Sequence, residues 1–216
     1  MMPAFTVRTR IKICGLTRRQ DVEAALGAGA DALGFILAES VRSVSMKQAA
    51  GLIRDLPPFV STVAVVADPS YGFLNSVIES GLFSHIQFHG HETPDIFEGI
   101  PLKKIKVFGI SPTEQMPDTE KYDKADYFLF DAKVGNAQGG TGRTIDWDRL
   151  RAAKIGKPFI LAGGLGPDNV ADAIRMCRPS AVDLNSCLES ALGVKDAELI
   201  RKAVMEVRIA DLSIRE

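Results

Sequence analysis

The chain has 216 residues, of which 46% are hydrophobic and 25% charged, and this near-average composition excludes a disordered, collagen-like or coiled-coil protein. Its 26 Lys and Arg residues almost balance 27 Asp and Glu residues, so the net charge of -1 provides no overall attraction for nucleic acid or an anionic membrane. Three widely spaced cysteines, Cys14, Cys177 and Cys187, argue against a disulfide framework and against a structural zinc site.

Short apolar segments rich in Val, Ile, Leu and Phe recur along the whole chain, as expected of strands that are buried on both faces. They predict eight strands, in chain order Ile11–Cys14, Ala32–Leu37, Ser61–Ala67, His85–His89, Lys104–Gly109, Tyr127–Asp131, Phe159–Ala162 and Ala181–Leu184.

Helix signals lie between the predicted strands. The pairs Thr17–Gln20 and Ser45–Gln48 have the spacing of capping boxes, and Pro167 suits the first position of a later helix. A last helix is predicted over Asp196–Val207, and the polar segment Ser111–Lys124 is expected to be a surface helix with loops.

Alternation of eight strands with helices, at roughly 27 residues per unit, predicts parallel strands with helices outside them. Eight units favour one closed (β/α)8 barrel, the TIM-barrel fold, as a single domain over residues 1–216. An open doubly wound sheet is the alternative, and it usually carries a nucleotide-binding fingerprint. The segment Gly164–Asn169 lacks the third glycine of the dinucleotide-binding fingerprint. The segment Gly135–Thr141 lacks the lysine of the phosphate-binding Walker motif.

The N-terminal sequence has no long apolar stretch of the kind found in signal peptides. The most apolar segments of the whole chain, such as Phe59–Ala67, are also too short to span a bilayer. We therefore expect a cytoplasmic protein with neither a membrane nor a nucleic acid as its partner.

Two reactive side chains stand at predicted strand ends, and the C-terminal ends of the strands carry the active site of such a barrel. Cys14 closes the first strand and Asp131 closes the sixth. A carboxylate that directly follows four apolar residues is costly to desolvate unless it is paired or functional. The alternatives are a small buried core residue for Cys14 and a turn or cap residue for Asp131.

The segments after the seventh and eighth strands are candidates for anion binding. Gly163 and Gly164 follow the seventh strand, and Asp183, Asn185 and Ser186 lie at the end of the eighth. Barrels often bind phosphate at this place through backbone N–H groups, which glycine allows to approach closely. The alternative is that the glycines only turn the chain.

Three further features are weaker. Gly139–Arg143 follows the sixth strand and could close over a substrate, and Arg42 could pair with a carboxylate. His89 and His91 have a spacing that can ligate a metal, but no further ligands accompany them, so we expect no metal site.

The sequence resembles the phosphoribosylanthranilate isomerase family of tryptophan biosynthesis over nearly its whole length. The matching segments, in order, are Lys12–Gly15, Gly29–Phe35, Gln87–Gly90, Phe130–Asp131, Gly139–Thr144 with Asp146–Trp147, Leu161–Leu165 and Val182–Leu184. That family has the (β/α)8 fold, in agreement with the eight units of the chain.

The resemblance implies an Amadori rearrangement of N-(5-phosphoribosyl)anthranilate, with Cys14 as general base and Asp131 as general acid. It implies no cofactor, because the nitrogen of the substrate is itself the electron sink. It places the phosphate at Gly163, Gly164, Asn185 and Ser186. We expect a small phosphorylated substrate and a monomer or homodimer.

The resemblance also assigns substrate-binding positions nearer the ribose and the aromatic ring. Arg42 matches the arginine that the family turns toward the anthranilate carboxylate, and His89 and Asp183 are expected to contact the substrate.

The chain departs from the family pattern after the eighth strand, where Asp, an aliphatic residue, Ser, Ser and Gly are usual. Here the segment is Asp183–Cys187, which ends in cysteine. Two other functions stay open: a different phosphosugar isomerase or epimerase barrel, and a catalytically silent paralogue that binds a phosphorylated metabolite.

Overall fold

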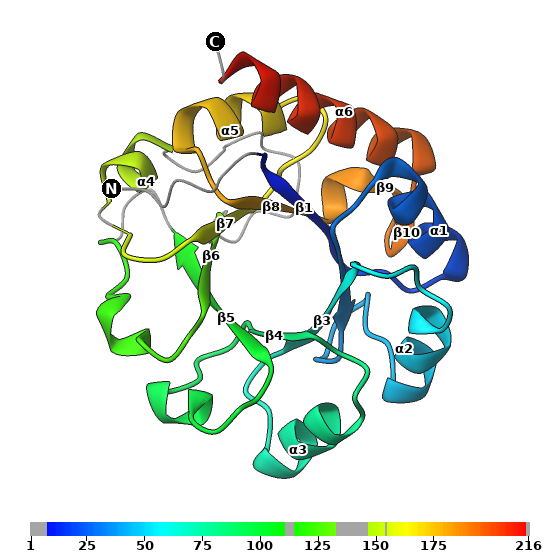
Figure 1. Ribbon diagram of the computed structural model, residues 1–216, viewed down its shortest axis with the longest axis vertical. Helices are drawn as coiled ribbons and strands as arrows, with labels where there is room; N and C mark the ends of the chain where they lie inside the picture. Colours follow the sequence, from blue (N-terminus) through cyan, green and yellow to red (C-terminus); the bar gives the residue numbers. More distant parts are fainter. Residues whose placement is uncertain (1–7, 111–114, 133–146, 154, 215–216) are drawn as a thin grey trace.

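The computed structural model describes residues 8–110, 115–132, 147–153 and 155–214. Eight parallel strands close into a barrel, because β1 pairs with both β2 and β8 (Figure 1). The strands are β1 (Arg10–Ile13), β2 (Ala32–Ile36), β3 (Ser61–Val66), β4 (His85–Phe88), β5 (Lys103–Ile110), β6 (Tyr127–Ala132), β7 (Phe159–Ala162) and β8 (Ala181–Leu184). The predicted (β/α)8 fold is confirmed, and every predicted strand boundary agrees with the structure to within one residue.

Helices surround the barrel on the outside (Figure 1). The α-helices are α1 (Arg19–Ala28), α2 (Met46–Ile53), α3 (Tyr71–Glu79), α4 (Trp147–Ala152), α5 (Val170–Cys177) and α6 (Ala197–Ser213). Short 3-10 helices are η1 (Pro94–Phe97), η2 (Glu120–Tyr122) and η3 (Ser186–Leu188). A small antiparallel hairpin, β9 (Glu189–Ala191) with β10 (Val194–Lys195), follows β8 and was not predicted.

The helix starts test the capping predictions individually. Ser45 forms the predicted capping box with Gln48 at the start of α2. The capping box at Thr17 is wrong, because α1 begins at Arg19 and the Thr17 hydroxyl instead donates to the carbonyl of Gly193, 3.0 Å away.

Three other helix predictions need correction. Pro167 lies in a turn, and α5 begins only at Val170. The last helix starts where predicted, with Asp196 as its N-cap, but continues to Ser213. Within the predicted surface helix Ser111–Lys124, the described residues 115–124 contain only the 3-10 helix η2.

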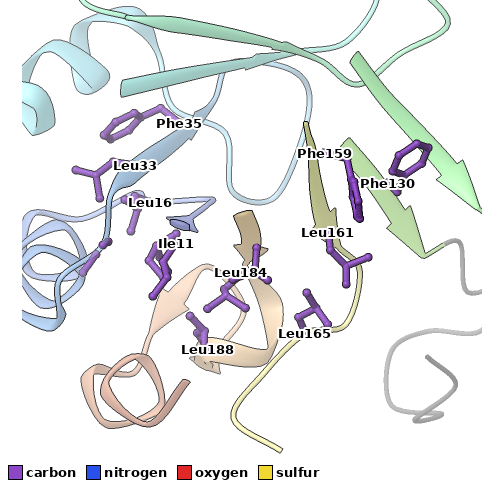
Figure 2. Packing of buried hydrophobic residues seen from close by; sticks show 14 of the residues in the cluster. Ile11, Leu16, Leu33, Phe35, Phe130, Phe159, Leu161, Leu165, Leu184 and Leu188 are labelled. Atoms are coloured by element: carbon purple, nitrogen blue, oxygen red, sulfur yellow. The ribbon is translucent and has the colours of Figure 1, made fainter. Parts of the chain in front are cut away.

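Strand alternation divides the apolar residues into two groups. Those pointing outward, such as Phe35 and Phe130, pack beneath the helices, as Figure 2 shows for part of this layer. A smaller cluster fills the barrel interior and includes Val63, Ile105 and Leu129. Because the interior is packed, the substrate must bind at an end of the barrel rather than in a channel through it.

Candidate active site

A cavity of about 150 Å³ lies at the C-terminal ends of the barrel strands. It collects every predicted site residue except Arg42. Its polar lining comprises Cys14, Gln87, His89, Asp131, Gly163, Gly164, Asp183, Asn185 and Ser186. Larger hollows lie between α4 and α5 and at the opposite end of the barrel, but neither is lined by Cys14 or Asp131.

Cys14 directly follows β1, where its backbone N–H donates to the carbonyl of Leu184 on β8 at 2.9 Å. Gly15 then turns the chain with a φ of 70°. The outward positions Ile11 and Ile13 belong to the layer beneath the helices, so alternation directs Cys14 inward. Burial raises the pKa of the Cys14 thiol, and the charge of neighbouring Lys12 opposes that shift.

Gly34 on β2 provides the space that the Cys14 thiol occupies. A Cβ at Gly34 would lie 2.8 Å from Cys14 Sγ and 3.1 Å from its Cα. We predict that Gly34→Ala displaces the thiol and lowers kcat at least about tenfold, a loss of roughly 1.4 kcal/mol in transition-state stabilisation. Steady-state kinetics on a folded variant would check this. Gly51, on α2 with open space around it, provides the control Gly51→Ala, which should retain full activity.

Asp131 lies near the end of β6, beside Gly109 of β5 and Ala162 of β7 in the strand register. Burial, and then the negative charge of Asp183, raise the pKa of Asp131 to about 6. This is the direction that suits a general acid. The carboxyl group can therefore hold a proton closer to neutral pH than an ordinary aspartate.

His89 is a titratable neighbour of Asp131 in the cavity lining. Its Nε2 lies 3.8 Å from Asp131 Oδ2. Partial burial lowers the pKa of His89, and the charge of Lys12 acts in the same direction. A neutral imidazole therefore faces a carboxyl group that is easily protonated. Because the imidazole carries no positive charge, it does not stabilise the ionised form of Asp131.

The turn after β7 has the backbone that the predicted phosphate site requires. Gly163 and Gly164 both adopt positive φ, 90° and 63°, where a side chain would be strained. Asn169 holds this turn, because its side chain accepts from the N–H of Gly166 and donates to the carbonyl of Gly164. Asn185 and Ser186, after β8, line the same cavity.

Arg42 is held by a carboxylate of the protein itself. Its Nε and Nη2 donate to the two carboxylate oxygens of Glu189, each at 2.7 Å. Lys195 donates to Glu189 at 2.9 Å and to the side chain of Asn185 at 2.7 Å. Partial burial would raise the pKa of Glu189, but the hydrogen bonds from Arg42 and Lys195 outweigh it and lower that pKa to about 2. The sequence analysis identified neither Glu189 nor Lys195.

Cys187 lies outside the cavity lining, on the exposed side of η3. It is not among the described residues with positive φ, and its Cβ lies 2.7 Å from where a Cβ of Gly166 would be. Since the cysteine backbone needs no glycine here, Cys187→Gly should change KM by less than about tenfold, roughly 1.4 kcal/mol, and leave kcat near the parent value. Parallel kinetics would measure this. A gain of about a hundredfold in kcat/KM would show that cysteine impairs the phosphate site.

The two histidines of the H-x-H pattern do not converge. His91 is fully exposed, and its Nδ1 lies 3.4 Å from Oδ2 of Asp68. His89 faces Asp131 instead. Within the described part of the chain, no group of three or more His, Cys, Asp or Glu side chains could hold a metal ion. The predicted closing loop Gly139–Arg143 lies outside the described residues. Among the helices that the structure describes, none combines the length and apolarity needed to cross a membrane.

The fold and the cavity define a barrel enzyme with a thiol and a carboxyl group facing one small site at the C-terminal ends of the strands. The sequence profile of the N-(5'phosphoribosyl)anthranilate (PRA) isomerase family matches residues 11–206. The chain therefore belongs to the PRA isomerase family.

Individual relatives agree with the family match. The N-(5'-phosphoribosyl)anthranilate isomerase of Petrotoga mobilis is 47% identical over 196 residues, which cover 90% of this chain and 95% of the relative. The N-(5'-phosphoribosyl)anthranilate isomerase of Pseudomonas putida is 43% identical over 203 residues, which cover 93% of this chain and 98% of the relative.

Solved structures are similar along the same length. The phosphoribosyl anthranilate isomerase of Thermotoga maritima superposes with a TM-score of 0.85 at 32% identity and covers 93% of this chain and 98% of its own. A structure of the isomerase in complex with reduced 1-(o-carboxyphenylamino)-1-deoxyribulose 5-phosphate has a TM-score of 0.81 at 30% identity, with the same coverage.

Proposed function

We propose that this protein catalyses the Amadori rearrangement of N-(5'-phosphoribosyl)anthranilate to 1-(2-carboxyphenylamino)-1-deoxyribulose 5-phosphate in tryptophan biosynthesis, with Asp131 as general acid and Cys14 as general base. The observation that carries the assignment of roles is the placement of a buried thiol and a carboxyl group with a raised pKa in the lining of one cavity.

The first step is opening of the ribose ring. Protonated Asp131 donates its proton to the ring oxygen as the bond from that oxygen to C1 breaks, which leaves an iminium ion between C1 and the anthranilate nitrogen. The pKa of about 6 means that a useful fraction of Asp131 holds this proton near neutral pH. A general acid matched in this way to its working pH is an efficient proton donor.

The second step is removal of the proton from C2. The iminium ion makes this proton acidic, so the Cys14 thiolate can accept it and become a thiol. The electron pair of the C2–H bond forms a double bond between C1 and C2, and the π pair of the C=N bond moves to nitrogen and neutralises the iminium ion. The resulting enol becomes the ketone product when C1 takes a proton from solvent and the C2 hydroxyl group releases one. No external electron acceptor is needed, because the substrate supplies its own.

Substrate binding follows from the turns around the cavity. The backbone N–H groups of Gly163 and Gly164, together with Asn185 and Ser186, are suited to hold the phosphate, because glycine lets the backbone approach a ligand closely. The related isomerase bound to a reduced product analogue supports a phosphorylated small molecule as the ligand.

The remaining contacts position the other parts of the substrate. His89 and Asp183 line the same cavity as the phosphate turn and the catalytic pair, and they are the polar side chains available to the ribose. Arg42 uses Nε and Nη2 for Glu189, and within the described residues its Nη1 has no hydrogen bond. That free nitrogen is available to the anthranilate carboxylate. The proposal places the protein in the cytoplasm, as a monomer or homodimer.

The most specific test uses purified protein and substrate made in situ from anthranilate and phosphoribosyl pyrophosphate by a phosphoribosyltransferase. The fluorescence of the anthranilate group should fall, and mass spectrometry with chromatography should identify the rearranged product. Because the substrate also hydrolyses, recovery of free anthranilate alone would contradict the proposal.

Chelation separates this reaction from that of a metal-dependent epimerase barrel. The mechanism routes both proton transfers through protein side chains, so we predict that EDTA leaves kcat and KM unchanged. The measurement compares chelated and untreated protein in the same fluorescence assay. Inactivation that a divalent metal reverses would instead favour the epimerase alternative.

A further inference from the structure

A buried lysine lies directly beneath the proposed active site. Lys12 is on β1, two residues before Cys14, and its side chain is 4% exposed. Its Nζ lies 2.7 Å from Oδ2 of Asp183, which is itself 8% exposed. Lys12 does not belong to the lining of the cavity, so it does not take part in the substrate contacts described above.

A buried ion pair of this kind contributes little to stability, because desolvation of the two charges offsets their attraction. An apolar pair of similar volume is often as stable, and the surrounding barrel interior contains residues such as Val63, Ile105 and Leu129. Packing alone therefore does not explain a lysine at this position.

The geometry brings the ammonium group of Lys12 next to the thiol of Cys14. Both side chains point inward from β1, and Gly34 on the neighbouring strand leaves them room. The point that a Cβ of Gly34 would occupy is 3.0 Å from Lys12 Nζ and 2.8 Å from Cys14 Sγ. The cation and the sulfur thus converge on the same space.

Asp183 holds the ammonium group of Lys12 in this position through one of its two carboxylate oxygens. One carboxylate oxygen accepts from Lys12, while the other, Oδ1, is buried and has no hydrogen-bond partner in the described part of the chain. Burial raises the pKa of the Cys14 thiol, whereas the charge of Lys12 and a hydrogen bond from it lower that pKa. Two charges from other elements also act on the pKa of Cys14: Asp183 on β8 raises it, and Lys195 on β10 lowers it. Arg42 is a further cation that interacts with Cys14.

We propose that Lys12 is a positioning residue whose ammonium group stabilises the thiolate of Cys14 and holds it oriented for removal of the C2 proton. The inference deepens the proposed function, because it assumes that Cys14 is the base. In each turnover the thiolate accepts the C2 proton and becomes a thiol, while Lys12 keeps all its protons. Asp183 keeps the ammonium in place when the sulfur is neutral.

The test is the reactivity of Cys14 in Lys12→Met, which keeps the length of the side chain and removes its charge. Iodoacetamide would be applied to free enzyme from about pH 6 to 10, and mass spectrometry of peptides would follow Cys14, with Cys177 and Cys187 as references. Because burial already raises the pKa of this thiol, the shift is read from rates below the midpoint: we expect Cys14 in the variant to be alkylated at least about tenfold more slowly than in the parent at the same pH, which corresponds to an upward shift of about one pH unit. In the same variant kcat should fall at least about tenfold, with KM within about threefold of the parent.

Lys106 offers a matched control. It forms an equally buried pair, with its Nζ 2.7 Å from Glu92, on the outer side of the barrel wall. Lys106→Met should lose stability in a similar way but leave the alkylation profile of Cys14 unchanged. The double variant Lys12→Met with Asp183→Asn removes both charges and avoids an unpaired carboxylate if the single variant folds poorly. Its profile should shift in the same direction but by less, because Asp183 itself raises the pKa of Cys14.

An unchanged Cys14 alkylation profile in both Lys12 variants would overturn the inference. This outcome is distinguishable from failure of the proposed function. If Cys14→Ala has no activity but loss of Lys12 leaves the thiol unaffected, the base assignment stands and the role of Lys12 is rejected. If Cys14→Ala is fully active, Lys12 has no catalytic group to act through, and its role falls together with the base assignment.

Discussion

Replacing Cys14 with alanine should reduce kcat by about 10²–10⁴-fold, because the C2 proton then has no general base. The fold should survive, since the change removes one sulfur from a side chain that borders a cavity. Circular dichroism and thermal unfolding would check the fold, and the fluorescence assay would give kcat and KM. The loss should fall on kcat, because the thiol acts on the reacting atoms and not on the phosphate or the aromatic ring.

Cys177 provides a matched control for this substitution. It is also buried, but it lies on α5 and outside the cavity lining. Cys177→Ala should lower the free energy of unfolding, as removal of a buried group does, and keep the parent kcat. If Cys14→Ala works within about threefold of the parent rate, Cys14 is not the base.

Asp131→Asn should abolish turnover by a different route. The amide keeps the shape of the side chain but cannot deliver a proton to the ring oxygen, so kcat should fall by about 10²–10⁴-fold while KM changes little. Steady-state kinetics over a range of substrate concentrations would separate the two constants. A large rise in KM with unchanged kcat would show instead that Asp131 only binds the substrate.

The same substitution should stabilise the protein at alkaline pH. The pKa of Asp131 is about 6 in the folded protein, above its unfolded value of 3.8, so the folded state disfavours the carboxylate. Above about pH 6 the charged side chain therefore lowers stability. Asparagine should remove this cost, roughly 1 to 2 kcal/mol after solvent screening, and the gain should vanish below about pH 4.

Asp126, at the opposite end of the barrel just before β6, should show the reverse behaviour. Burial would raise its pKa, but hydrogen bonds from the Lys104 backbone and from the side chains of Lys103 and Lys104 lower it to about 2. Its carboxylate therefore stabilises the folded state above pH 3.8, and this contribution is lost as the pH falls toward 2. Asp126→Asn should be less stable than the parent near neutral pH and remain active. Denaturant titrations at several pH values would compare the two aspartate variants.

The strands were predictable because each is a short apolar segment bounded by polar residues, and parallel strands in a barrel are buried on both faces. The site followed from the same pattern. Once eight strands are recognised, the reactive residue that ends a strand must face the C-terminal end of the barrel, as Cys14 and Asp131 do.

The parts that could not be predicted depend on contacts between distant segments. Thr17 has the local spacing of a cap, but the carbonyl of Gly193 competes for its hydroxyl group. Arg42 and Glu189 are 147 residues apart, and they meet only because the β9–β10 hairpin after β8 brings Glu189 to the segment after β2. Lys12 resembles an ordinary charged residue in the sequence, and its partner is Asp183, 171 residues away.

Growth without tryptophan tests the central claim most directly, in a bacterial strain that lacks its own phosphoribosylanthranilate isomerase and produces this protein. The parent protein should restore growth, whereas Cys14→Ala and Asp131→Asn should fail although both accumulate as soluble protein, as immunoblotting would show. Failure of the parent to restore growth, or restored growth with either variant at a rate equal to the parent, would contradict the assigned reaction or the assigned acid and base.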